Sequence, residues 1–562
     1  MEFCKGTFLT GLLMILASVS HGIELPDGFV DETYISGLEG QITAFDTRAE
    51  GRVFISEKSG IVRVAINRQL LDEPFVDLQE FVNDRVDRGM LSIAVHPQFP
   101  QSPFVYVLYS YDPPELLDSE LDELDVDTRG LDGNGNRVAR LVRYTADASR
   151  DFNVAVEGSE TVILGKNSTF EAIGDPAGGF DTDTPSCGTI VNPLEDCLPA
   201  DEVTHTIGAL RFATDGSLFV TNGDGASFRS FSPISQMALN LDSLRGKILR
   251  IDAETGLGLS DNPFYDENPS SNRSRVFSYG LRNPYSLTLH PLTGEPYVGE
   301  VGDQAWEEIN MGRGNNFGWP CFEGGDSVSL RKPGFESETY CQELYDANEA
   351  VEAPLISWEH DDRGNAAVVG DFYFDDVFPE QYKGTLFYGD FIKGWLRYAD
   401  FSDPGNVTEN DFATNMLPMV EIRTGDDGAL YYASITTGEI RRIRYTNADP
   451  TGSEGSEGSE GSEGSEGSEG SEGSEGSEGS EGSEGSEGSE GSEGSEGSEG
   501  SEGSEGSEGS EGGDGIPDAL APNDGSSDTQ QVTVGHTSSF LAGIIALVLA
   551  SRRRCRFLFQ CS

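Results

Sequence analysis

Positive charge is scarce in this sequence, and long apolar runs are absent from it. The 562 residues include 37 Lys and Arg against 98 Asp and Glu, a formal net charge of −61. Nucleic acids are bound by surfaces rich in Lys and Arg, so this balance argues against a nucleic-acid partner. It fits a soluble, self-repelling protein outside the cytoplasm.

Both ends of the chain resemble processing signals. The apolar run 8–17 follows Lys5 and precedes small residues, which predicts a signal peptide over residues 1–22, with a buried first helix as the alternative. At the other end, the apolar run 540–550 is shorter than the ~17–20 residues that span a bilayer comfortably, and an arginine cluster follows it. A GPI signal is disfavoured because such signals end in the apolar tail.

We therefore expect a C-terminal hydrophobic sorting or anchor segment over residues 538–562. The protein would then lie at the cell surface or in the periplasm, tethered to the membrane by its C-terminus or released after processing.

Residues 453–512 are the triplet Ser-Glu-Gly repeated twenty times, and this composition cannot bury a core. The repeat holds 20 of the 98 acidic residues, and the remaining 78 still outnumber the basic ones. We expect a disordered linker over 447–512, about 40–45 Å long on average as a neutral coil and longer with its charges. An acidic spacer over 513–537 follows it.

Cysteine is also scarce. Three of the seven cysteines lie in the terminal segments, which leaves Cys187, Cys197, Cys321 and Cys341. They form two close pairs in sequence, so the simplest assignment is two local disulfides, Cys187–Cys197 and Cys321–Cys341. A zinc site is the alternative, although no Cys-x-x-Cys spacing supports it.

One strand pattern recurs six times between residues 40 and 446. Each copy has a Gly turn, a short strand rich in β-branched and aromatic residues, a gap and a second strand that often begins Gly-x-Ile-x-Arg, as in 51–64 and 427–443. Six copies of about 68 residues each predict an all-β, six-bladed β-propeller over residues 23–446. An array of β-sandwiches would not explain the shared order. The long acidic insertions 110–138, 165–203, 225–243 and 321–365 are of a length typical of functional or disordered loops, and we expect function in the two that contain cysteines, 165–203 and 321–365.

Five motifs, in this order, resemble the PQQ-dependent glucose/sorbosone dehydrogenases. They are Asp87–Pro97, His205–Leu210, Gly280–Pro284, Glu300–Asn310 and Gly314–Pro320. The resemblance covers about residues 25–446 and implies a six-bladed propeller, which matches the repeat count. It also implies oxidation of an aldose or related polyhydroxy sugar at its C1 hydroxyl, with the hydride passed to the quinone PQQ and on to an external electron acceptor. The same family includes animal extracellular propellers, so the alternative is a non-catalytic propeller that binds a protein or glycan at the cell surface.

The resemblance also implies roles for single residues. It places the general base on His205, and histidine suits this role because its unperturbed pKa is near neutrality. Arg282 would stabilise the oxyanion and the reduced quinone. Arg282, Asn283 and Lys393 would hold the cofactor, and Asp87 would bind the substrate.

A calcium site is implied at Gly302 and Asp303, where calcium would act as a Lewis acid on the quinone. The last blade departs from the family pattern. Pro418 and Val420 stand where arginines hold the PQQ carboxylates, and Arg423 is out of register, which favours the non-catalytic alternative.

The remaining motifs have simpler interpretations. His96 and His290 both precede Pro at equivalent repeat positions, which indicates turn histidines at blade corners, whereas His360 is a lesser candidate base. The segments 125–136 and 514–520 resemble calcium loops, but a solvated acidic loop is the better interpretation of both.

Overall fold

The structure is a computed structural model. It describes residues 22–446 except 50, 118–131, 177–183, 227–231, 326–329, 348–350, 362–364 and 403–405. The chain divides into two units, 1–458 and 459–562, and all described residues belong to the first. Apart from Gly22, the predicted signal peptide, linker, spacer and C-terminal segment lie outside the described residues and stay predictions. No helix in the described ranges is long and apolar enough to cross a membrane.

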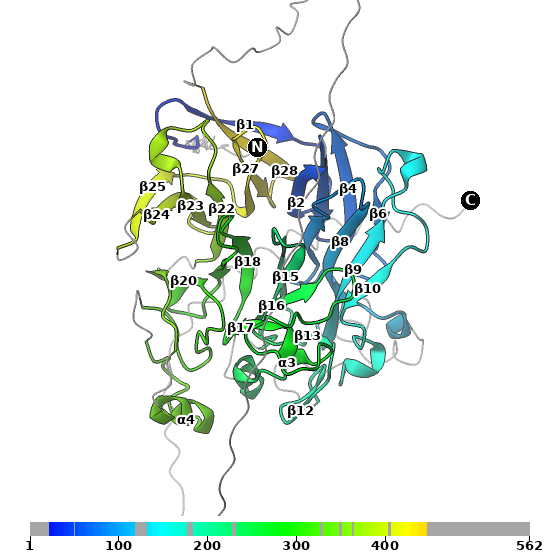
Figure 1. The fold of residues 1–562 in the computed structure, drawn as a ribbon, viewed down its shortest axis with the longest axis vertical. Coiled ribbons are helices and arrows are strands. Elements are labelled where there is room, and N and C mark those ends of the chain that lie inside the picture. The colour runs from blue at the N-terminus through cyan, green and yellow to red at the C-terminus, as the bar shows by residue number, and fades with distance from the viewer. Residues whose placement is uncertain are drawn as a thin grey trace, which may run out of the picture. The chain divides into compact units, whose positions relative to one another are not determined.

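Six antiparallel sheets form the blades of a β-propeller (Figure 1). Blade 1 comprises β2 (Ile42–Ala49), β3 (Arg52–Glu57), β4 (Ile61–Ile66), β5 (Gln69–Leu70) and β6 (Val76–Asp77). Blade 2 comprises β7 (Met90–Val95), β8 (Phe104–Tyr111), β9 (Arg137–Thr145), β10 (Thr161–Leu164) and β13 (Leu198–Ala200). Blade 3 comprises β14 (Ile207–Phe212), β15 (Ser217–Asn222), β16 (Lys247–Asp252) and β17 (Val276–Tyr279).

The second half of the ring follows the same plan. Blade 4 comprises β18 (Pro284–Leu289), β19 (Pro296–Glu300), β20 (Trp306–Met311) and β21 (Ile356–Glu359). Blade 5 comprises β22 (Ala367–Tyr373), β23 (Thr385–Asp390), β24 (Trp395–Asp400) and β25 (Thr408–Ala413). Blade 6 comprises β26 (Met419–Thr424), β27 (Leu430–Ser434), β28 (Glu439–Tyr445) and β1 (Phe29–Ile35). This architecture confirms the predicted all-β, six-bladed propeller.

The ring closes by pairing the first strand of the chain with the last. β1 runs antiparallel to β28, from Phe29 opposite Tyr445 to Ile35 opposite Ile440. Phe29 packs edge-on against aromatic rings of blade 5, including Phe378 and Phe412. A chain segment that precedes the first blade therefore completes the sixth.

Short elements fill the loops between the strands. The 3-10 turns are η1 (Pro114–Leu117), η2 (Ala148–Arg150), η3 (Phe170–Ala172), η4 (Pro233–Leu239) and η5 (Glu380–Tyr382). The described α-helices are α3 (Asn272–Arg275) and α4 (Thr339–Ala347), and β11 (Gly188–Thr189) pairs with β12 (Asn192–Pro193). Both predicted disulfides, Cys187–Cys197 and Cys321–Cys341, are formed in these loops.

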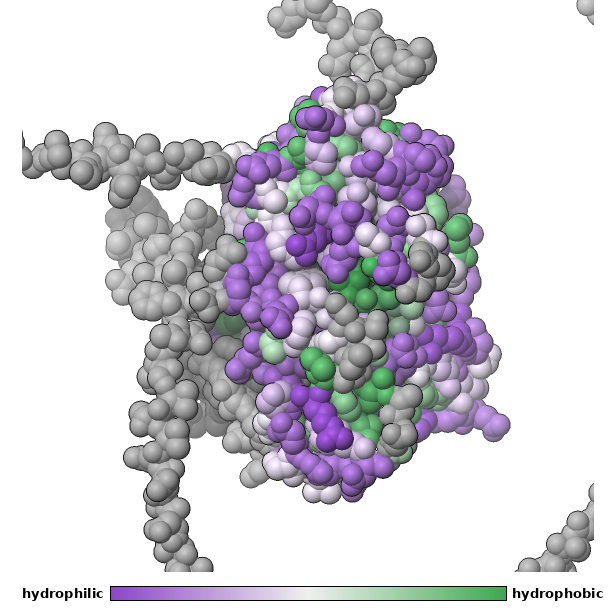
Figure 2. Space-filling view, turned by 90° about the vertical axis from the view of Figure 1, so that its left-hand side faces the viewer, coloured by the Kyte–Doolittle hydropathy of each residue, from purple (hydrophilic) through white to green (hydrophobic). Residues whose placement is uncertain are grey.

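The hydrophobic core lies between neighbouring blades. Most strands are buried on both faces, and the cluster between blades 1 and 2 includes Phe54, Val64, Val107 and Val142. This explains why the strands read as runs of β-branched and aromatic residues instead of strict alternation. The side of the molecule in Figure 2 is mostly hydrophilic, with apolar residues in separate patches, in keeping with the acidic composition.

The first strand of each blade lines the propeller axis. β2, β7, β14, β18, β22 and β26 each contact the first strands of the two adjacent blades. Their starts meet at one end of the axis, called here the start face, and their ends meet at the other, the end face. Six residues at about 3.3 Å each place the two faces about 20 Å apart.

The two proline-preceding histidines confirm their predicted structural role. His96 Nδ1 accepts a hydrogen bond from the backbone N–H of Gln98, at 3.1 Å. His290 Nδ1 accepts equivalent bonds from Leu292 and Thr293, at 3.2 and 3.3 Å. Each ring therefore fixes the turn that ends an axial strand.

Arg88 ties the long loops of blade 2 to the start face. Its fully buried guanidinium donates to the carbonyls of Gly133, Gly135, Ala200, Asp201 and Glu202. Burial, helped by the charge of Arg137, lowers its pKa to about 9. The described part of the calcium-like segment, residues 132–136, thus binds an arginine. The rest of that segment lies outside the described residues.

Candidate active site

His205 is held on the start face by a buried carboxylate. It lies just before β14, is 4% exposed and has a φ of +50°, a conformation uncommon for a residue with a side chain. Its Nδ1 lies 3.2 Å from Asp224 Oδ1. The other carboxylate oxygen, Asp224 Oδ2, accepts a hydrogen bond from Trp319 Nε1 at 2.7 Å. His205, Asp224 and Trp319 therefore form one hydrogen-bonded chain.

A glycine-rich turn after β15 places Asp224. The backbone N–H of Asp224 donates to the carbonyl of Arg282 at 2.7 Å, and that of Gly225 donates to the carbonyl of His205 at 2.9 Å. A Cβ at Gly223 would lie 2.2 Å from the same His205 carbonyl oxygen, so only glycine fits there. The turn thus connects the two residues predicted to be catalytic.

The surroundings of His205 favour the neutral imidazole. Burial and the positive charge of Arg282 lower its pKa, while the hydrogen bond and charge of Asp224 act in the opposite direction. Because Asp224 accepts at Nδ1, the ring keeps its proton there and presents a bare Nε2. A neutral imidazole with a bare Nε2 can take a proton.

Arg282 is anchored by backbone carbonyls next to this histidine. It is 4% exposed, and its Nη1 donates to the carbonyls of Val301 at 2.8 Å and Gly302 at 2.6 Å. Its Nη2 lies 3.4 Å from Asp303 Oδ1. The guanidinium also lies 5.5 Å from the centre of the Trp319 ring. Arg282 therefore supplies a fixed positive charge to the site.

Asp87 lies in the same charged group and is exposed to solvent. Although the residue is open to solvent, the protein packed around its carboxylate desolvates it and raises its pKa, and the charges of His205, Lys58 and Arg282 act against that rise. Its backbone N–H donates to the carbonyl of Val203, two residues before His205. The structure thus brings together Asp87, His205 and Arg282, which lie far apart in the sequence. Asn283 follows Arg282 directly, and the backbone N–H groups of both residues donate to Glu300 Oε1.

Asp303, one of the two predicted calcium positions, is already paired with a lysine side chain of the same protein. Lys332 Nζ lies 2.9 Å from Asp303 Oδ2 and 2.7 Å from Glu323 Oε2, and its side chain is 7% exposed. Glu323 Oε1 also accepts the backbone N–H of Asp303 at 2.7 Å. Burial raises the pKa of Asp303, but the charges of Arg282 and Lys332 outweigh it and hold that pKa below its usual value.

These contacts do not fit the predicted calcium site. Calcium needs six to eight oxygen ligands, but the Gly302 carbonyl already accepts from Arg282 and the Asp303 carboxylate faces Arg282 and Lys332. An ion placed there would meet two positive charges at close range. Among the described residues, no group of three or more His, Cys, Asp or Glu side chains is arranged to hold a metal ion.

The charged side chains of this face are of the type that binds an acidic quinone. Lys58 from blade 1, Arg282 and Lys332 from blade 4, and Lys393 from blade 5 all lie on it, each beside a carboxylate. Lys393 pairs with Asp361. These four cations have the charge needed to pair with the three carboxylates of PQQ, although each would first have to leave the carboxylate of the chain beside it.

Blade 6 adds no cation at the start face. Val420 is 6% exposed and belongs to the core cluster that also contains Phe45 and Ile35. Pro418 directly precedes β26. Arg423 lies near the other end of β26 and lines a cavity on the end face. Pro418 and Val420 thus leave the start of β26 without a positive charge, and blade 6 carries the charge of Arg423 at the other end of this strand.

Three residues of this site had no role assigned from the sequence, and one lesser candidate lies apart from it. Asp224 could have been suspected, because it is a carboxylate in a Gly-Asp-Gly turn after a strand. Trp319 lies in the Gly314–Pro320 motif but received no role, and Lys332 had no signal, since it reaches the site from the loop closed by the Cys321–Cys341 disulfide. His360, the lesser candidate base, pairs with Glu307 at 2.5 Å and not with the His205 group.

Known proteins show the same fold. The chain is 29% identical to the aldose sugar dehydrogenase YliI of Escherichia coli over 247 residues, 43% of this chain and 61% of that protein. It is 22% identical to human Hedgehog-interacting protein over 275 residues, 47% of this chain and 32% of that one. The crystal structure of the soluble aldose sugar dehydrogenase of E. coli in its apo-form matches with a TM-score of 0.51, 20% identity, and coverage of 74% of this chain and 99% of that one.

Two family models match the chain. The collagen triple helix repeat model matches residues 447–520, because glycine occupies every third position of the Ser-Glu-Gly repeat. This match does not test the disordered linker expected over 447–512, which stays a prediction. The Glucose / Sorbosone dehydrogenase model matches residues 42–176 and 194–442, from the first axial strand to the last blade. The chain therefore belongs to the Glucose / Sorbosone dehydrogenase family.

Proposed function

We propose that this protein is an exported PQQ-dependent sugar dehydrogenase that oxidises an aldose or related polyhydroxy sugar at its C1 hydroxyl. One observation carries the proposal. The buried His205 has Asp224 on Nδ1 and a lowered pKa, beside the fixed charge of Arg282 and the exposed carboxylate of Asp87. The blade-corner histidine His96 instead accepts a backbone N–H, and Glu254, the carboxylate that acts on its pKa, is exposed.

The protein side chains divide the work of the reaction. PQQ, when bound, supplies the quinone that accepts the hydride from C1. Nε2 of His205 takes the proton of the C1 hydroxyl, while Asp224 keeps Nδ1 protonated and stabilises the imidazolium that forms. Arg282 provides preorganised positive charge where negative charge develops, and Asp87 accepts hydrogen bonds from sugar hydroxyls. Arg282, Asn283 and Lys393 are the residues that would hold the cofactor.

Calcium has no part in this proposal, because Lys332 and Arg282 already contact the Asp303 carboxylate and the Gly302 carbonyl that the ion would need as ligands. An external acceptor must reoxidise the cofactor after each turnover. The sequence signals at both ends support action outside the cytoplasm, with the membrane reached through residues 538–562.

Reconstitution tests the proposal. The full chain is mixed with PQQ with and without calcium and passed through gel filtration, and the retained quinone absorbance and aldose-dependent dye reduction are measured. We expect both signals without added calcium. His205→Ala should keep the absorbance and lose turnover, whereas the matched control His96→Ala should keep both. If the wild-type chain retains no quinone and reduces no dye, the enzyme proposal is wrong.

A second candidate is a non-catalytic propeller that binds a protein or glycan at the cell surface. It is favoured by the uncharged start of β26, at Pro418 and Val420, and by the match to Hedgehog-interacting protein. The same reconstitution separates the two candidates, because a binding propeller would retain no quinone. Turnover that survives in His205→Ala would likewise count against the catalytic role of this residue.

A further inference from the structure

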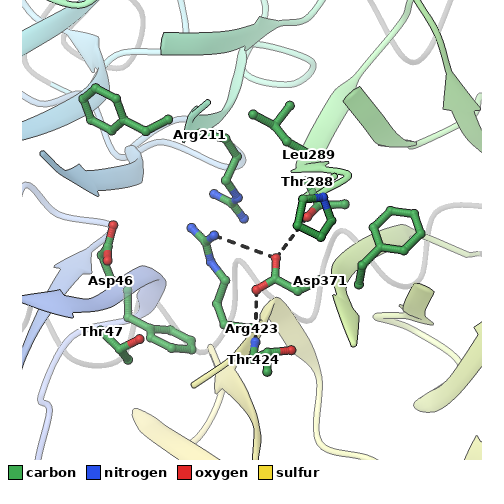
Figure 3. Close-up of a pocket in the computed structure, with 12 residues that line it drawn as sticks. Asp46, Thr47, Arg211, Thr288, Leu289, Asp371, Arg423 and Thr424 are labelled. Atoms are coloured by element: carbon green, nitrogen blue, oxygen red, sulfur yellow. Dashed lines mark hydrogen bonds and ion pairs between the residues drawn. The ribbon is translucent and has the colours of Figure 1, made fainter. Parts of the chain in front are cut away.

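A polar cavity lies on the end face, about 20 Å along the axial strands from His205. It has a volume of about 220 Å³ and is lined by residues near the ends of β2, β14, β18, β22 and β26. Its charged lining residues are Asp46, Arg211, Asp371 and Arg423 (Figure 3). Five of the six blades therefore contribute to one cavity.

An ion pair beside this cavity joins opposite blades across the axis. Arg211 Nη2 on β14 lies 2.6 Å from Glu421 Oε1 on β26, and these strands belong to the opposite blades 3 and 6. Arg423 Nε lies 2.5 Å from the same carboxylate oxygen. All three side chains are largely buried. His205 is not among the residues that line the cavity, and about 20 Å along the axial strands separate the two.

The cavity offers both donors and acceptors. In Figure 3 the guanidinium groups of Arg211 and Arg423 point toward one another, with Asp371 to one side. Asp371 accepts hydrogen bonds from Thr288 Oγ1 and the backbone N–H of Thr424, each at 3.0 Å. It also lies 4.0 Å from Arg423 Nη1. One wall of the cavity therefore presents both the Asp371 carboxylate as an acceptor and the Arg423 guanidinium as a donor.

Two polar atoms of this wall have no hydrogen-bond partner among the described residues. They are Arg423 Nη2 and Thr424 Oγ1, and both atoms are buried. A buried polar atom without a partner costs about 1–3 kcal/mol, so such atoms call for an explanation. Both atoms lie on β26 beside the cavity, and a ligand would complete their hydrogen bonding once these side chains turn toward it.

The charges select the kind of molecule. Two arginines face three carboxylates, Asp46, Asp371 and Glu421, and the rest of the chain is strongly acidic, which disfavours an anion. A neutral compound with several hydroxyl groups can accept from the guanidinium groups and donate to the carboxylates at once. A volume of 220 Å³ equals about seven water molecules at about 30 Å³ each, the size of one sugar ring. Phe45, Phe212 and Phe372 supply apolar walls for its C–H faces.

We propose that the end face carries a second binding site, separate from the His205 site, for a neutral polyhydroxy compound of monosaccharide size. The proposal stands independently of the sugar dehydrogenase function, because it rests on a different cavity and on none of the predicted catalytic residues.

Binding by the full chain without added cofactor tests the site, since no turnover occurs. The probes are D-glucose and sorbitol, with gluconate as the anionic comparison, measured by calorimetric titration or ligand-observed NMR. Leu289→Trp fills the cavity from its lining, and the matched control is Leu292→Trp, three residues later and 77% exposed. Asp371→Asn removes an acceptor with almost no change of shape.

We expect saturable binding of a neutral probe that weakens at least tenfold in Leu289→Trp and in Asp371→Asn. It should be unchanged in Leu292→Trp and in His205→Ala. Circular dichroism checks that each variant is folded, and Asp371→Asn carries the test if Leu289→Trp does not fold. The proposal is overturned if neither neutral probe binds, if only gluconate binds, or if His205→Ala abolishes binding while the end-face variants retain it.

Discussion

Replacing Lys332 with methionine removes the ammonium that joins Asp303 to Glu323. Removal of one partner from a buried ion pair costs about 3–5 kcal/mol, because the other charge is left uncompensated. Arg282 remains 3.4 Å from Asp303, so the uncompensated charge falls mainly on Glu323, which is 4% exposed. We therefore expect the free energy of unfolding to fall by about 3 kcal/mol, near the lower end of that range, in a urea titration followed by tryptophan fluorescence.

The same variant should acquire a response to calcium. With Lys332 gone, only Arg282 of the two opposing positive charges remains, and the carboxylates of Asp303 and Glu323 become available to calcium. Binding at a hundredfold excess over the dissociation constant restores about 2.7 kcal/mol, which is close to the whole loss. The double variant Lys332→Met/Glu323→Gln should lose less stability and respond less to calcium, since one of the two carboxylates is neutral. The wild-type protein should show no calcium-dependent shift.

The matched control is Lys383→Met, which removes an exposed lysine paired with the exposed Asp376. It should leave the unfolding transition unchanged, because solvent screens such pairs. The reasoning is refuted if calcium stabilises the wild-type chain as much as it stabilises Lys332→Met. It is also refuted if Lys332→Met unfolds with the same free energy as the wild-type chain.

Three further outcomes follow from the same contacts. Asp224→Asn should lower the turnover of the PQQ-reconstituted protein by about 10²–10⁴ while retained quinone absorbance stays constant, and a loss under tenfold would contradict its role in holding His205. Arg282→Gln removes a charge that lowers the pKa of His205, so that pKa rises; because the base must be deprotonated, the acid limb of the kcat–pH profile should move to higher pH, and a shift to lower pH would contradict this. Serine at both Cys321 and Cys341 should lower the free energy of unfolding by about 3 kcal/mol in denaturant titrations, as expected for a loop of about 20 residues, and an unchanged transition would show that this loop adds no stability.

The fold was predictable because its repeats are local. Each blade contains its own Gly turns and paired strands, so six copies of the pattern in one sequence indicate six blades. The closure of the ring was not predictable in this way. Phe29–Ile35 lacks the Gly-x-Ile-x-Arg pattern, and its partner Glu439–Tyr445 lies about 400 residues later in the chain. Only the geometry of a closed ring requires that pair.

The candidate site was predictable where a residue sits directly before an axial strand. Asp87, His205 and Arg282 occupy that position in blades 2, 3 and 4, so the common plan of the blades brings them to one face. Lys332 comes from the long loop between β20 and β21 of blade 4, and the repeat pattern of the sequence does not predict which residues such a loop contacts. The contact of Lys332 with Asp303, at the predicted calcium position, could therefore be found only from the structure.

Arg423 shows how a register difference changes the meaning of a residue. It follows Val420 by three positions, which is about 10 Å along a strand, so it cannot replace a start-face arginine. At that distance it meets Glu421, Asp371 and Arg211 on the end face. Blade 6 thus lacks a cation at one end of the axis and has one at the other. Because the two positions lie about 10 Å apart along β26, the missing start-face cation and the end-face cavity are separate features with separate consequences.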